Sequence, residues 1–188
     1  MSDVVERRSA AARVLVEGAS DRLALEALAR RRGDSLHGVE IVDLGGITNL
    51  RAALLATGTE GVLGLYDAAE QRYAARVLAA FGIADLEEAG FFGCVRDLED
   101  EVIRAAGPEL VLEALAERGE LARFRRFQRQ PAQRVRSIQE QLHRFAGTAA
   151  GRKSRFAADV IGVLPMERMP VPLTRVLDRA LASQNDET

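Results

Sequence analysis

The sequence predicts an α/β fold in which a four-stranded, mainly parallel sheet is flanked by helices and followed by a helical extension. Through the first half of the chain, short apolar runs alternate with segments of helical periodicity. That alternation is typical of parallel strands joined by right-handed crossovers. Beyond residue 107 the pattern is helical, with breaks at glycine and proline. We expect a disordered terminus at 1–10, an α/β domain at 11–106, an extension at 107–183 that completes a cleft, and a disordered tail at 184–188.

The first strand, expected at residues 14–16, runs into a tight turn at Gly18. Ser20 or Asp21 then suits the cap of a helix that Gly33 ends. The remaining strands are expected at 39–44, 61–66 and 90–95, with helices at 48–56 and 70–81 between them. In the extension, Gly107-Pro108 divides two helices, and Phe124 and Phe127 are expected to pack in the core rather than to stack on bases.

Composition limits the kinds of site that the chain can form. The sequence has 188 residues, 47% of them apolar, which suits one domain with an appendage. The lone Cys94 excludes an internal disulfide and a cysteine-based zinc cluster, and it is expected to be a small buried apolar residue. Neither His37 nor His143 has neighbours spaced for metal coordination. We therefore expect any metal to be held by oxygen atoms.

No apolar run reaches the 18 residues of a membrane span, and the chain does not start with a signal segment. We expect a soluble, unprocessed, cytoplasmic protein without a membrane partner.

Acidic residues follow three of the expected strands. In chain order, the three sets are Glu17 with Asp21, Asp67 with Glu70, and Asp97 with Glu99, Asp100 and Glu101. Because parallel strands point the same way, all three sets would meet at one edge of the sheet. Taken singly, each set is also explained as the acidic first turn of a helix. Converging carboxylates, however, need cations to offset their repulsion, and oxygen ligands favour Mg²⁺ or Mn²⁺.

Charge is distributed unevenly along the chain. Between residues 118 and 155 there are eleven Arg or Lys and two Glu, although the net charge of the whole chain is −2. A solvated helical face is one explanation. A basic wall beside an acidic crevice would instead suit a phosphodiester substrate. The candidate nucleic-acid-binding residues are Arg123, Arg125, Arg126, Arg129, Arg152 and Arg155.

The chain has one lysine, Lys153, among 26 basic residues. An arginine-biased composition would explain this. A compact ammonium group is also well suited to stabilise the charge of a phosphate under attack. The surrounding Gly147–Ser154 segment has the glycines of a P-loop, but Arg152 interrupts the motif and no strand is expected before it, so we reject an ATP site there.

Four motifs in order carry a family resemblance: Leu15-Val-Glu-Gly-Ala-Ser-Asp21, Leu44-Gly-Gly-Ile-Thr-Asn49, Leu65-Tyr-Asp67 and Phe92-Gly-Cys-Val-Arg-Asp-Leu-Glu-Asp-Glu101. They resemble the Toprim (Rossmann-like) region of OLD-family (overcoming lysogenization defect) nucleases over about residues 12–165. Toprim is the metal-binding fold of topoisomerases, bacterial primases and several nucleases.

The resemblance implies a two-metal DNA-cleaving site. Glu17 and Asp21 match its first acidic motif, Asp67 the first Asp of an Asp-x-Asp pair, and Asp97 with Glu99 the last acidic set. Ala69 stands where the second Asp is usual, and Glu70 is the candidate to replace it. OLD nucleases also resemble this chain in having a lysine after the acidic motifs, which supports Lys153 as a catalytic residue beside Glu17. OLD proteins normally carry an ATPase domain before this region, whereas this sequence starts almost at the first Toprim strand.

The leading functional hypothesis is a metal-dependent nuclease that hydrolyses DNA phosphodiesters by a two-metal mechanism. The partner would be DNA, with RNA as the alternative, and the resemblance allows a homodimer. A second hypothesis is a catalytically degenerate Toprim module that binds nucleic acid or a separate ATPase without cutting. A third is a regulatory protein whose basic helices meet a protein partner.

Overall fold

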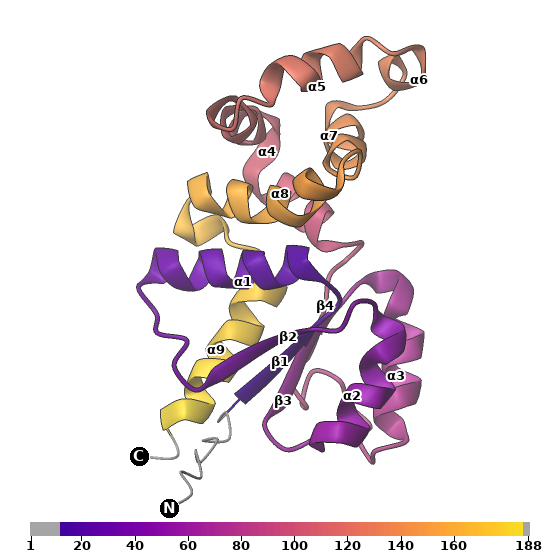
Figure 1. Cartoon of the computed structure of the whole chain (residues 1–188), viewed down its shortest axis with the longest axis vertical. Helices are drawn as coiled ribbons and strands as arrows, with labels where there is room; N and C mark the ends of the chain where they lie inside the picture. The colour runs from indigo at the N-terminus through magenta and orange to yellow at the C-terminus, as the bar shows by residue number, and fades with distance from the viewer. Residues whose placement is uncertain (1–11, 186–188) are drawn as a thin grey trace, which may run out of the picture.

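The computed structural model describes residues 12–185 and has four parallel strands in one sheet (Figure 1). The strands are β1 (Ala12–Val16), β2 (Val39–Asp43), β3 (Val62–Tyr66) and β4 (Phe91–Gly93), in the order β2-β1-β3-β4. In the central register, Val14 of β1 lies opposite Ile41 of β2 and Leu63 of β3. The α/β class and the parallel sheet predicted from the sequence are confirmed, with strand ends shifted by one or two residues.

Helices cover both faces of the sheet, as Figure 1 shows. Helices α1 (Ala19–Arg32) and α9 (Val171–Asn185) lie on one face, and α2 (Leu50–Thr57) and α3 (Gln71–Ala79) on the other. Alternation along β1 explains the two layers, because Val14 and Val16 enter the larger core while Leu15 enters the smaller one. Short 3-10 turns, Ile47–Asn49 and Ala68–Glu70, lead into α2 and α3.

The chain then leaves the sheet through α4 (Leu98–Glu117), which bends at Gly107, where φ is 75°. The second half of α4 and four further helices form what we call the helical lobe, residues 108–163. Those helices are α5 (Leu121–Gln128), α6 (Pro131–Arg134), α7 (Ile138–Ala146) and α8 (Ala150–Val163). Phe124 is fully buried, and its ring lies 5.2 Å from that of Phe145 and 6.5 Å from that of Phe127. The packing role predicted for Phe124 and Phe127 is confirmed.

The lobe is tied to the sheet domain through α8, which packs along α1 and α4. Arg31 of α1 donates from Nη1 to the carbonyl oxygen of Ile161 at 2.7 Å and also to that of Leu164. These bonds satisfy carbonyls at the end of α8, where a helix leaves its last acceptors free. These contacts tie the end of α8 to the last turn of α1.

The last part of the chain returns to the sheet. After a 3-10 turn at Met166–Arg168, α9 packs against β1, β3 and β4. One element of the expected extension, 107–183, therefore completes the sheet domain rather than the lobe. The expected terminus at 1–10 lies outside the described residues, as does 186–188, whereas residues 184 and 185 of the expected tail belong to α9.

Candidate metal and nucleic-acid site

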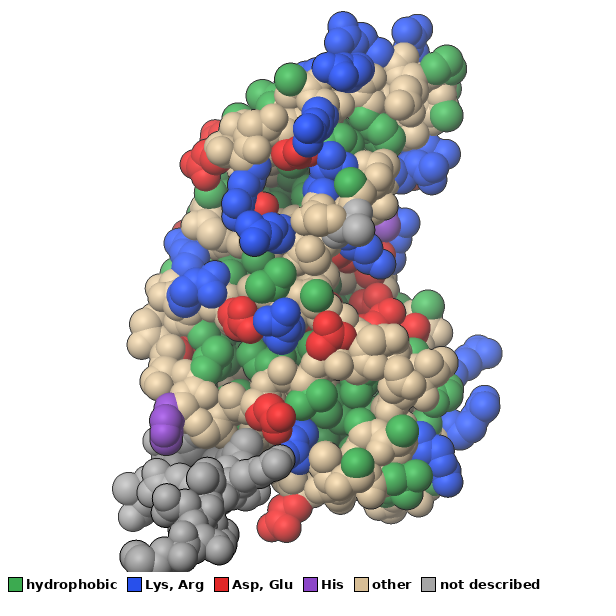
Figure 2. All heavy atoms as spheres, in the orientation of Figure 1, with side chains coloured by type: hydrophobic (Ala, Val, Ile, Leu, Met, Phe, Trp, Pro, Cys, Tyr) green, Lys and Arg blue, Asp and Glu red, His purple; other side chains and the backbone are tan. Residues whose placement is uncertain are grey.

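A cleft of about 680 Å³ lies at the carboxyl ends of the strands, bordered by α7 and α8. We call it the acid cleft. Figure 2 shows the acidic side chains gathered in the hollow between the sheet domain and the helical lobe. Its charged and polar lining side chains are Glu17, Ser20, Asp21, Asp43, Asp67, Asp97, Glu99, His143, Lys153 and Ser154. The structure thus brings together the acids that follow the different strands, as the parallel topology requires.

The first acidic motif is fixed by the turn between β1 and α1. The helix is capped by Gly18, whose backbone N–H donates to Asp21 Oδ2 at 3.0 Å. The prediction that Ser20 or Asp21 caps the helix was therefore wrong, because α1 already begins at Ala19. Asp21 instead occupies the third helical position, as in a capping box. Ser20 has another role: its hydroxyl donates to Glu99 Oε1 at 2.8 Å, which links the first and last acidic motifs.

Several of these acids have strongly raised pKa values. Burial, aided by the nearby Glu99 and Glu17 charges, raises the pKa of Asp21 to about 7. Burial, together with the charge of Asp21 and then Glu17, raises the pKa of Asp67 to about 8. Like charges confined together favour the protonated form of each other, and a cation among them would remove that penalty.

Glu70 lies beside Glu17 rather than out in solvent. Burial first, and then the Glu17 carboxylate, raise the pKa of Glu70 to about 7. Its Oε2 atom is buried and has no hydrogen-bond partner among residues 12–185. Glu70 thus lies next to Glu17 but does not line the acid cleft, and its replacement of the acid missing at Ala69 stays a prediction.

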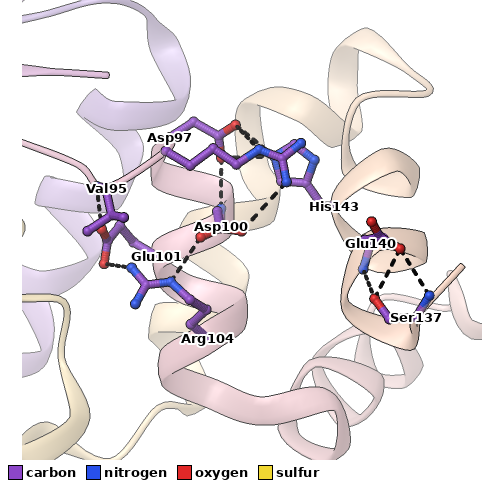
Figure 3. Close-up of polar contacts among 9 residues, drawn as sticks. Val95, Asp97, Asp100, Glu101, Arg104, Ser137, Glu140 and His143 are labelled. Carbon is purple, nitrogen blue, oxygen red and sulfur yellow. Dashed lines mark hydrogen bonds and ion pairs between the residues drawn. The ribbon is translucent and has the colours of Figure 1, made fainter. Parts of the chain in front are cut away.

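The last acidic motif divides into two groups (Figure 3). Asp97 caps α4 by accepting from the Asp100 backbone N–H at 2.8 Å, and its two carboxylate oxygens lie 2.9 and 2.7 Å from His143 Nε2. Glu101 is turned away into the core, where it accepts from the Val95 backbone N–H at 2.7 Å and pairs with Arg104 at 2.6 Å. Asp97 and Glu99 therefore line the cleft, whereas Glu101 stabilises the turn that presents them.

The contact between His143 and Asp97 was not predicted from the sequence. His143 lies on α7, 46 residues after Asp97 in the sequence, and the fold of the helical lobe brings the two together. Asp43, the last residue of β2, is a second cleft residue that we did not predict. The signal for Asp43 was present, because it is an acid at the end of an expected strand; no local pattern pointed to His143.

The turn after β2 contributes backbone to the cleft. Gly45 and Gly46 have φ values of 64° and 119°, which residues other than glycine rarely adopt. The Gly46 N–H donates to the Glu17 carbonyl oxygen at 2.9 Å. The Gly45 N–H donates to Asp43 Oδ1 at 2.9 Å. The glycine pair thus holds the β2 end against the first acidic motif.

Lys153 lies in the first turn of α8, and its exposed side chain lines the acid cleft together with that of Ser154. The segment before it, from Gly147, is preceded by α7 and not by a strand, which agrees with rejecting a P-loop there. The expected catalytic lysine and the expected metal-binding acids other than Glu70 thus share one cleft.

The six candidate nucleic-acid-binding arginines do not form a single surface. Arg125, Arg126 and Arg129 are exposed on α5 and at its end. Arg123, Arg152 and Arg155 line a second cavity, inside the helical lobe. Arg152 is the most enclosed: 12% of its side chain is exposed, and it pairs with Glu120 at 2.5 Å.

The acidic side chains of the cleft are suitable ligands for a divalent cation, but they are not arranged around a common point. Among residues 12–185, no three Asp, Glu, His or Cys side chains lie close enough together to hold one ion. The donor set is nevertheless of the hard oxygen type, it includes the unpartnered Glu70 oxygen, and its members raise each other's pKa.

Comparison with known proteins agrees with this architecture. The family model "Overcoming lysogenization defect protein-like, TOPRIM domain" matches residues 10–57. The C-terminal region of the Burkholderia pseudomallei OLD protein superposes with a TM-score of 0.68 at 18% identity, covering 93% of this chain and 98% of that one. The fold is that of an OLD-like Toprim domain. The corresponding region of the Xanthomonas campestris pv. campestris OLD protein gives a TM-score of 0.67 at 20% identity, covering 95% and 98%. No curated protein sequence matches the chain.

The resemblance predicted from the four motifs is therefore confirmed. Toprim domains belong to nucleases and other nucleic-acid enzymes and generally use divalent metals. No helix among residues 12–185 is long and apolar enough to cross a membrane.

Proposed function

We propose that the protein is a metal-dependent nuclease that hydrolyses DNA phosphodiesters in the acid cleft. One observation carries the proposal: acids from the ends of different strands and the single lysine of the chain line the same cleft. The similarity to OLD Toprim regions supports it, because that similarity covers nearly the whole chain.

In this proposal Mg²⁺ or Mn²⁺, as one or two ions, would be held by Glu17, Asp21, Asp67, Glu70, Asp97 and Glu99. When bound, such ions supply Lewis-acid chemistry that activates water and stabilises the leaving oxygen.

The other groups of the cleft act through charge and position. Lys153 is exposed at the start of α8, where its ammonium group would offset charge on the scissile phosphate. Ser20 fixes the Glu99 carboxylate through its 2.8 Å hydrogen bond, and His143 fixes that of Asp97. The arginines on the exposed surface of α5 would contact phosphates along the duplex without reading bases.

The direct test is cleavage of supercoiled plasmid and of labelled linear and single-stranded DNA in Mg²⁺, Mn²⁺ or EDTA. Glu17→Gln and Lys153→Ala should each lose cutting by about 100-fold or more. Glu60→Gln and Arg51→Ala remove the same charges from exposed positions outside the cleft and should cut like the wild type. Equal cutting by the two sets of variants would contradict the proposal.

A second candidate is a Toprim module that binds DNA, or a separate ATPase, without cutting. Two observations favour it: Ala69 occupies the usual second acid position, and both oxygens of Asp97 already face His143. Retarded DNA migration in EDTA, with no cutting in either metal, would support this candidate over the nuclease. Co-purification with an ATPase would identify the other partner.

A further inference from the structure

A second cavity of about 360 Å³ lies within the helical lobe, between α4, α5 and α8. Its floor is apolar and made of core residues that are at most 5% exposed: Val111, Ala114, Leu115, Phe156 and Val160. Four arginines surround this floor: Arg118, Arg123, Arg152 and Arg155. Two acids, Glu120 and Asp159, complete the charged lining. We call it the lobe pocket.

The lobe pocket carries more positive than negative charge. Glu120 pairs with Arg123 at 2.5 Å and with Arg152 at 2.5 Å, and Asp159 pairs with Arg118. Arg155 is exposed and forms no ion pair with any residue in the described range 12–185. Four cations against two anions leave an excess of two positive charges around an apolar floor, which favours a ligand with an anionic end and an apolar body.

Arg152 organises the lobe pocket rather than offering itself to a ligand. Its Nε and Nη2 atoms donate to Glu120, and its Nη1 atom donates to the Phe145 carbonyl at 3.2 Å and to the Thr148 hydroxyl. Its guanidinium also lies 3.9 Å from the centre of the Phe145 ring. Arg118 and Arg123, by contrast, each use one Nη atom in their hydrogen bonds and keep other donors free.

The first turns of α8 separate the lobe pocket from the acid cleft. Arg152, Arg155 and Phe156 face the lobe pocket, whereas Lys153 and Ser154 face the acid cleft. This division follows from helical periodicity, because residues three and four apart share one face. A ligand in the lobe pocket would therefore not occupy the position proposed for the scissile phosphate.

We infer that the lobe pocket binds a nucleoside monophosphate group, with its base on the apolar floor and its phosphate against Arg118, Arg123 and Arg155. Guanidinium groups match phosphate oxygens in planar pairs, and the apolar face of a flat base can lie against a floor without charged atoms. The group has two possible sources, a free nucleotide or the phosphorylated end of a DNA strand. Both present the same chemistry to the lobe pocket.

The test is calorimetric binding of dAMP in EDTA, which removes metal-mediated phosphate binding in the acid cleft. Failure of dAMP to bind would therefore not contradict the proposed nuclease activity, and a failure to cleave DNA would not contradict a ligand site in the lobe pocket. Deoxyadenosine and inorganic phosphate supply the two halves of the ligand separately, and a short 5′-phosphorylated oligonucleotide supplies the strand end. We expect dAMP to bind at least about tenfold more tightly than either half, because the halves lose one set of contacts each.

The variants separate the lobe pocket from general positive charge. Arg155→Ala should weaken dAMP binding about tenfold by removing a charged hydrogen bond, whereas Arg144→Ala, an equal charge change at an exposed position outside the lobe pocket, should not. Ala114→Leu should abolish binding by filling the floor. If Ala114→Leu does not fold, the exposed Arg155→Ala carries the test alone.

Three outcomes decide between the possibilities. Binding of dAMP that Arg155→Ala weakens supports a free-nucleotide site. Oligonucleotide binding with the same sensitivity, without dAMP binding, supports the strand end as the source. Absence of binding by both at millimolar concentration, or binding that Arg155→Ala leaves unchanged, would overturn the inference.

Discussion

The substitution Asp21→Asn should stabilise the metal-free protein at pH 8. Burial raises the pKa of Asp21 from its usual value near 4 to about 7, so the folded protein must accommodate an unfavourable charge at high pH. Three pKa units correspond to about 4 kcal/mol as an upper limit. After allowance for solvent in the open cleft, we expect a gain of about 1–2 kcal/mol in the free energy of unfolding. The Asn side-chain oxygen can still accept the Gly18 N–H, so the capping contact survives.

The direction of the pH dependence is fixed by the raised pKa. The unfolded chain loses the Asp21 proton near pH 4, whereas the folded protein keeps it until about pH 7. The contribution of Asp21 to stability is therefore complete below pH 4 and declines as the pH rises to 7. The advantage of Asp21→Asn should accordingly be small at pH 4 and largest at pH 8.

Urea unfolding in EDTA at pH 4.5, 6 and 8 would measure this difference, with Glu60→Gln as the control for loss of an exposed charge. A variant that is equal to or less stable than the wild type at pH 8 would refute the electrostatic reasoning. So would an advantage that does not change with pH.

Three further predictions concern packing, Asp97 and the cation. Gly93→Ala should lower the free energy of unfolding by about 1–3 kcal/mol, because an added Cβ would lie 2.7 Å from the Tyr66 ring. At Gly162 an added Cβ would meet no atom within 4 Å, so Gly162→Ala should be neutral or stabilising. Equal melting temperatures of the two variants would contradict this reasoning. His143→Ala should weaken Mn²⁺ binding about tenfold, because the Asp97 carboxylate would lose the contact that orients it, and His143→Gln should partly restore the affinity. An unchanged affinity would show that His143 does not position Asp97. The rise in melting temperature produced by Mg²⁺ should be larger at pH 8 than at pH 5, because acids with pKa values of about 7 to 8 are protonated at pH 5; an equal rise at both pH values would argue against carboxylate binding.

Much of the fold could be predicted from the sequence because its signals are local. Apolar runs such as Val14 to Val16, followed by Gly18, determine a buried strand and its turn from adjacent residues. Parallel topology then places strand-end acids at one edge, which brought Glu17, Asp67 and Glu99 into one cleft without any further assumption. The capping error at Ser20 and Asp21 was a shift along the same turn.

What the sequence did not reveal depends on contacts between distant segments. His143 reaches Asp97 only because the helical lobe folds back over the sheet edge. The pairing of the largely enclosed Arg152 with Glu120 likewise joins segments 32 residues apart, and the basic run in which Arg152 lies did not indicate it. The return of α9 to the sheet has the same origin, because an amphipathic helix does not specify which apolar surface it will cover.

Direct binding of Mn²⁺ tests the central claim, that the strand-end acids form a divalent-cation site. Titration followed by electron paramagnetic resonance would count bound ions in the wild type, in Glu17→Gln and Asp67→Asn, and in the Glu60→Gln control. We expect one or two saturable ions in the wild type and in the control, and weaker or absent binding in both cleft variants. Saturable binding that is the same in all four proteins, or none in the wild type at millimolar Mn²⁺, would contradict the account.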